Sequence, residues 1–154
     1  ATQVGALSTA QVAAMETADL ASLSTDALAG LGTDDIVALT TAQAGALTAA
    51  QVAELSTAQL AALETRDLVQ LSTAAIAALD VTQLGALTDA QLGALTTDQV
   101  RAIDIADLAS LALADVQALG WVGLVGIMAT PEKCGSGTNR PGVLMGYRWK
   151  RGGL

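Results

Sequence analysis

The sequence contains no histidine and no phenylalanine, and it has only one cysteine, one tyrosine, two tryptophans and two prolines among its 154 residues. Without histidine, the commonest general base and metal ligand of proteins is missing. The single cysteine, Cys134, can form neither an intramolecular disulfide nor a zinc site made of several thiolates. The net charge of −8 excludes the excess of basic residues that binds nucleic-acid phosphates. We therefore expect no enzyme activity, no cofactor, no metal site and no nucleic-acid partner.

Small and medium-sized apolar residues are abundant, because 52% of the chain is hydrophobic although only 2% is aromatic. This content is sufficient for a buried core. The apolar run at 121–129 has about half of the roughly 20 residues that a membrane-spanning helix requires. We expect no transmembrane segment. The start at Ala1, without methionine, favours a processed, exported chain that lies outside the cell or on its surface.

An eight-residue repeat runs through residues 1–119 in one register, as in Ser8-Thr9-Ala10-Gln11-Val12-Ala13-Ala14-Met15. One apolar column, mostly leucine, recurs at every eighth residue from Leu7 to Leu119. A second apolar column lies three residues earlier, and a polar column of Gln or Asp directly precedes it. Ala27 and Ala75 interrupt the polar column. Fifteen copies in phase identify a repeat protein.

The spacing of the columns excludes two simple structures. In one continuous α-helix the apolar stripe would drift by about 80° per octad, so no face could remain buried. In a β-strand, the two columns would point to opposite faces because they are three residues apart. Ser or Thr three residues before Gln is instead the capping-box pattern of a helix start. Each octad is therefore predicted to form a helix of one to two turns.

Helices this short are unstable alone and require stacking on neighbours. Ala and Gly between the apolar columns allow close approach of the backbones. We predict an all-α solenoid of short capped helices over residues 1–119, with a β-solenoid as the alternative. Runs such as Leu55-Ser56-Thr57-Ala58-Gln59-Leu60-Ala61-Ala62-Leu63 resemble the octad arrays of large bacterial surface proteins that are labelled as adhesion or haem-utilisation proteins. This resemblance implies a surface or adhesion role.

Residues 120–154 form a second, non-repeat segment, for which we expect an extended or β-hairpin-like cap or assembly arm. Residues 1–119 carry a net charge of −12, whereas 120–154 carry +4. Complementary charges predict either folding of the segment onto its own array or head-to-tail docking on another copy. Aromatic residues and arginine are enriched in interfaces, and the basic cluster adds charge. The predicted subunit interface comprises Trp121, Tyr147, Arg148, Trp149, Lys150 and Arg151.

The sequence thus favours a structural, self-assembling extracellular filament subunit, whose partner is another copy of itself. One alternative is a monomeric segment of a bacterial surface adhesin that binds a ligand on a host or cell surface. Another alternative is an ice-binding protein that uses the column of threonines beginning at Thr9. The carboxylate pairs, such as Asp34 and Asp35, are expected to be helix caps and solvated surface.

Overall fold

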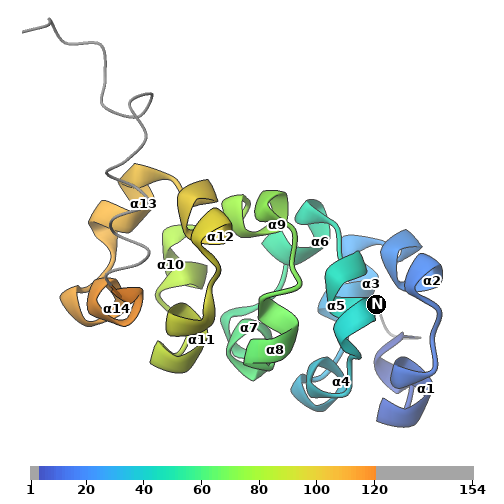
Figure 1. The fold of residues 1–154 in the computed structure, drawn as a ribbon. Helices are drawn as coiled ribbons and strands as arrows, with labels where there is room; N and C mark the ends of the chain where they lie inside the picture. The colour runs from blue at the N-terminus through green and yellow to red at the C-terminus, as the bar shows by residue number, and fades with distance from the viewer. Residues whose placement is uncertain (1–3, 121–154) are drawn as a thin grey trace, which may run out of the picture.

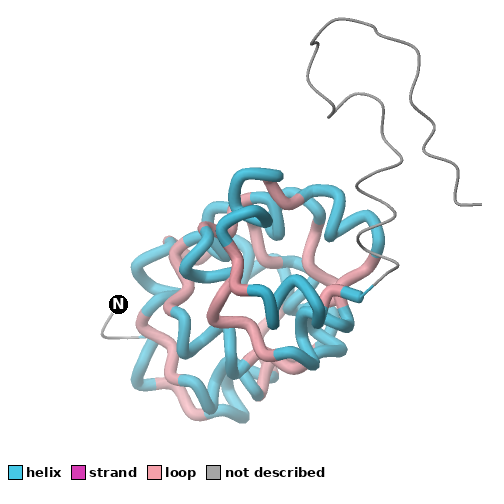
Figure 2. The backbone as a smooth tube through the Cα atoms, turned by 90° about the vertical axis from the view of Figure 1, so that its left-hand side faces the viewer, coloured by secondary structure: helices cyan, strands magenta, loops and turns pink. Residues whose placement is uncertain are grey.

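The computed structural model describes residues 4–120, and this part of the chain is helical, with no strand among the described residues (Figure 2). Each octad forms one short helix. The elements are η1 (Val4–Ala6), α1 (Thr9–Ala13), α2 (Thr17–Ser22), α3 (Thr25–Ala29), α4 (Thr33–Val37), α5 (Thr41–Ala46), α6 (Ala49–Ala53), α7 (Thr57–Ala62), α8 (Thr65–Leu68), α9 (Thr73–Ala77), α10 (Val81–Leu84), α11 (Asp89–Ala94), α12 (Thr97–Ala102), α13 (Ile105–Ser110) and α14 (Leu113–Ala118).

The helices begin where the sequence predicts caps. At α7, the Ser56 hydroxyl accepts the Gln59 backbone N–H at 3.2 Å, and Gln59 Oε1 accepts the Ser56 N–H at 2.9 Å. Every predicted Ser, Thr or Asp cap accepts a hydrogen bond from its helix. Glu16 and Glu64 have cap dihedrals without a side-chain bond. Ten of the fourteen α-helices among the described residues thus begin at a predicted side-chain cap, whereas α2, α4, α8 and α14 begin without one.

The short helices stack in three rows, and each helix contacts the helix three octads later (Figure 1). The rows are η1-α3-α6-α9-α12, α1-α4-α7-α10-α13 and α2-α5-α8-α11-α14. Side-chain hydrogen bonds described below reach across four octads instead. One superhelical coil of the array therefore contains between three and four octads.

The two apolar columns form one continuous core along the array. Leu20, Leu28, Ile36, Leu60 and Leu68 have no exposed surface. The small residues after the second column permit the stacking, since a Cβ atom added at Gly93 would lie 3.2 Å from the Ala118 carbonyl oxygen of the next helix in the row.

The prediction of an all-α solenoid of short capped helices is thus confirmed for residues 4–120, and the β-solenoid alternative is wrong there. Each octad favours a helix over a β-strand because it contains its own cap and buries its two apolar side chains from one helical face. The predicted hairpin-like segment at 120–154 lies outside the described residues, apart from Gly120.

Candidate functional site

Buried glutamines connect successive coils of the solenoid. The side-chain amide Nε2 of Gln43 donates to the carbonyl oxygens of Val12 and Met15, both at 2.8 Å. Each of the six glutamines of this kind reaches the carbonyl 28 residues earlier at 2.6–3.0 Å, and at least one further carbonyl of the same octad. We call each set of these bonds a glutamine bridge. The bridges start from Gln43, Gln51, Gln59, Gln83, Gln91 and Gln99.

The same six side chains also complete the helix caps. Gln91 Oε1 accepts the backbone N–H of Thr88 at 2.8 Å, while its Nε2 donates to Leu60 and Leu63. Only a side-chain amide offers an acceptor and two donors together, and the shorter Asn would not span the same distance. Because these glutamines are buried, the bonds satisfy polar groups of both coils that water does not reach.

Two consecutive octads in the middle of the array have no glutamine at this position. Asp67 of α8 is fully buried, and neither of its carboxylate oxygens has a hydrogen-bond partner. Arg66 Nε lies 3.8 Å from Asp67 Oδ2, beyond hydrogen-bond distance, and pairs with Glu64. Ala75 of α9 is buried and carries no polar side-chain group. The carbonyls 28 residues earlier belong to Leu39 and Leu47, and they accept no hydrogen bond from any described residue.

The bridges give the array a direction, because donors always point to the preceding coil and acceptors to the following one. In the first described coil, Gln11 forms the cap with Ser8, but its Nε2 has no acceptor among the described residues. In the last coil, Asp107 and Asp115 occupy the position that glutamine holds in the bridged octads, which we call the ladder position, and they donate no bond to Leu79 or Leu87. The two ends are therefore chemically different and complementary.

The apolar core is also incomplete at both ends. Met15 and Leu23 in the first coil, and Leu108 and Leu111 in the last, are only partly buried. Leu113, at the start of α14, belongs to the exposed threonine column outside this core and is 75% exposed. Apolar surface at the end of a repeat array is the surface that normally receives another repeat or a cap.

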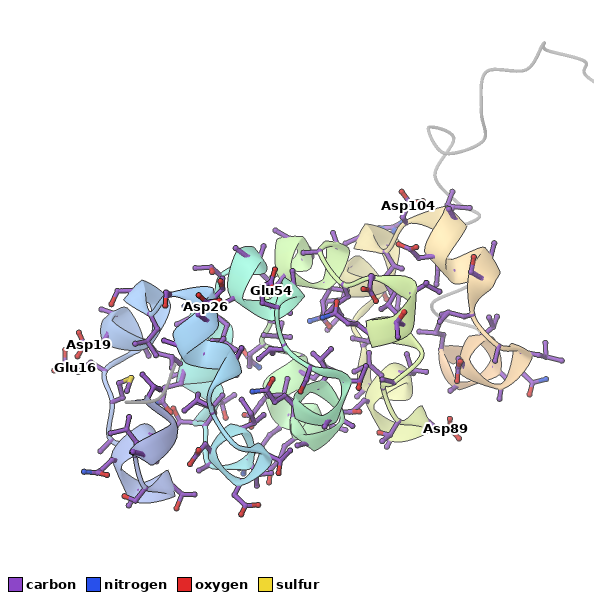
Figure 3. The ribbon with its side chains drawn as sticks, turned by 180° about the vertical axis from the view of Figure 1, so that it is seen from behind. Glu16, Asp19, Asp26, Glu54, Asp89 and Asp104 are labelled. Carbon is purple, nitrogen blue, oxygen red and sulfur yellow. The ribbon has the colours of Figure 1, made fainter. Side chains whose placement is uncertain are left out.

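The carboxylates do not form a cleft. Asp26, Glu54, Asp89 and Asp104 are exposed, and Asp89 and Asp104 lie at opposite edges of the array (Figure 3). Asp104 caps α13, and Asp35 accepts the Gly32 N–H at 3.0 Å, as expected of caps. Among the described residues, no group of three acidic or other ligating side chains could hold a metal ion, and none of their helices could span a membrane.

The threonine column occupies the first position of the helices. Because the helices stack in three rows, the members of this column are distributed over the three rows. In one row the exposed Thr17, Thr41 and Thr65 are followed by Asp89 and Leu113. In another, Thr9, Thr33 and Thr57 are followed by Val81 and Ile105. Each row thus aligns threonines only over part of its length.

The six predicted interface residues, Trp121, Tyr147, Arg148, Trp149, Lys150 and Arg151, all lie outside the described residues. The sequence prediction treated the glutamines as capping residues only and missed their bonds to the preceding coil. A signal was present: glutamate, which serves equally well in a capping box, never occurs in this column. Glutamine is the commonest residue of the column, and it is the only residue type there whose side chain can donate a hydrogen bond.

Two stretches of the array, residues 12–49 and 60–97, match the model of the ALTTAQ repeat family. Among curated proteins and solved structures, none matches the chain. The matches support a repeat family, in agreement with the stacked octads, and both stretches lie within the array.

Proposed function

We propose that this repeat protein is the subunit of an extracellular filament, in which copies join head to tail. The direction of the glutamine bridges is the observation that carries this proposal. One end offers the side-chain amide of Gln11, which has no acceptor among the described residues, and the other offers the carbonyls of Leu95 and Ile103, which accept no hydrogen bond from a described residue and have no described octad stacked four octads later. Two copies in the same orientation would continue the pattern that already joins coil to coil. Such a contact is heterologous and therefore generates an open polymer unless it closes into a ring.

The apolar surfaces at the two ends support the same arrangement. Met15 and Leu23 at one end, and Leu108 and Leu111 at the other, belong to the columns that are fully buried in the middle of the array. Burial yields about 25 cal/mol per Å² of apolar surface. Stacking of one end on the other therefore uses the interaction that already stabilises the solenoid.

Charge gives residues 120–154 a role in this contact. The array is strongly acidic, whereas this segment contains five basic residues and one acidic residue. In the proposed filament the segment of one copy lies on the acidic array of the next, with Trp121, Tyr147, Arg148 and Trp149 at the interface. Charge complementarity of this kind speeds association and depends on salt. The resemblance to bacterial surface arrays supports an extracellular location.

Electron microscopy of the purified chain at low and high salt tests the proposal. Fibres of constant width are expected at low salt, and Arg148→Glu with Arg151→Glu should abolish them. A variant with Lys133→Glu and Arg140→Glu has the same change of charge outside the predicted interface, so it should still polymerise. Single short rods at every protein and salt concentration would contradict assembly. They would instead favour the monomeric adhesin segment.

A further inference from the structure

Two neighbouring glutamine bridges are missing in the middle of the array, between the bridges of Gln59 and Gln83. Four bridges would cross the linker between α7 and α8 if each ladder position held glutamine. Only two exist, from Gln83 of α10 to α6 and from Gln91 of α11 to α7. The two bridges that would join α8 to α4 and α9 to α5 are missing, because Asp67 and Ala75 stand where these bridges would need glutamine.

The missing bridges lie on one side of the solenoid. With between three and four octads per coil, successive helices are rotated by a quarter to a third of a turn. The places at which bridges would join α8 to α4 and α9 to α5 are therefore next to each other. The two intact bridges, from α10 to α6 and from α11 to α7, occupy the remainder of the circumference.

Separation of successive coils has different consequences on the bridged and on the unbridged side of the solenoid. At a bridged position, separation of the coils breaks at least two hydrogen bonds of a buried glutamine. At Asp67, separation breaks no side-chain hydrogen bond and gives water to a buried carboxylate that has no donor. The carbonyls of Leu39 and Leu47 gain water in the same movement. The stacking of α8 on α5 and the burial of Leu68 and Ile76 oppose the opening.

We propose that octads α4–α5 and α8–α9 form a one-sided hinge, at which the array bends by separation of these octads while the bridges of Gln83 and Gln91 stay closed. The hinge lets a solenoid in a filament or on a surface bend between its bridged coils. Because the helices are too short to persist without stacked neighbours, opening also exposes the backbone amides of α8 and α9.

Hydrogen–deuterium exchange of the full chain, followed by mass spectrometry, tests the hinge. The amides of α8 and α9 should exchange at least tenfold faster than those of the bridged helices α6, α7 and α11. Asp67→Gln supplies an amide at the ladder position, so it should slow exchange of α8 about tenfold. Equal exchange rates in α8 and in the bridged helices, or a change spread evenly over the array, would overturn the proposal.

Asp19→Gln is the matched control for this substitution. Asp19 and Asp67 occupy the same position in their octads, each follows a glutamate cap, and the octad four earlier than α2 is not among those described. The same mutation at Asp19 should leave exchange of α8 and α9 unchanged.

A second pair of variants keeps the hinge testable if Asp67→Gln does not fold. Gln83→Ala removes a bridge that crosses the hinge. Gln43→Ala removes the bridge from α5 back to the α1 octad, which does not cross the α7–α8 linker. Only Gln83→Ala should accelerate exchange of α8 and α9. Equal acceleration by the two variants would contradict the hinge.

Discussion

The side-chain nitrogen of Gln91 lies 2.6 Å from the carbonyl oxygen of Leu63, 28 residues earlier in the chain. This bond joins one coil of the solenoid to the next, and five other glutamines repeat it. The array is therefore stabilised by polar cross-connections as well as by its apolar columns.

Gln91→Ala should lower the free energy of unfolding by about 1–3 kcal/mol, because buried carbonyls of Leu60 and Leu63 lose their donor and the Thr88 N–H loses its acceptor. Urea denaturation followed by circular dichroism measures the loss. Gln11→Ala is the control, since Gln11 forms the same cap without a bridge among the described residues. If both variants lost equal stability, the bridge would contribute nothing beyond the cap.

Ser56→Ala should cost about 1 kcal/mol, because the Gln59 backbone N–H loses the hydroxyl that accepts it at the start of α7. Glu16→Ala should be close to neutral, since Glu16 makes no side-chain cap bond. Thermal unfolding of the two variants under identical conditions compares them. A larger loss for Glu16→Ala than for Ser56→Ala would contradict the capping assignment.

Leu60→Ala should destabilise the array by about 2–5 kcal/mol, because Leu60 has no exposed surface and the truncation leaves a cavity in the core. Leu113→Ala removes the same atoms from a side chain that is 75% exposed, so we expect a change within about 0.5 kcal/mol. Denaturant midpoints distinguish the two. Similar losses at both positions would show that Leu113 is covered in solution, for example by another copy of the chain.

Gly45→Ala should raise stability by about 0.5–1 kcal/mol, because alanine favours the helix and its Cβ would lie 3.4 Å from the Gln70 carbonyl oxygen, an ordinary contact. Gly5→Ala should give no such gain, since its Cβ would lie 2.6 Å from the Gly30 carbonyl oxygen and would push η1 away from α3. Calorimetric melting temperatures test the difference in sign. A gain at Gly5 equal to that at Gly45 would contradict the close stacking of this row.

The local features of the array were predictable from the sequence because they depend on residues within one octad. Ser56 and Gln59 are three residues apart, so the cap forms whatever lies around it. The burial of Leu60 and Leu63 follows from their positions in the two apolar columns. The interface predicted at Trp121 and Tyr147–Arg151 is untested, since these residues lie outside the described part of the chain.

One capped helix per octad, the two buried columns and the small residues that allow stacking all follow from the amino-acid sequence, because short-range hydrogen bonds and the apolar pattern decide them. The packing of the helices reveals that a coil contains between three and four octads, that glutamines bridge residues 28 apart, and that Asp67 and Ala75 leave one side unbridged. These features depend on the angle at which each helix follows the last. Small rotations in every linker add up along the array, and the sum decides which octads meet.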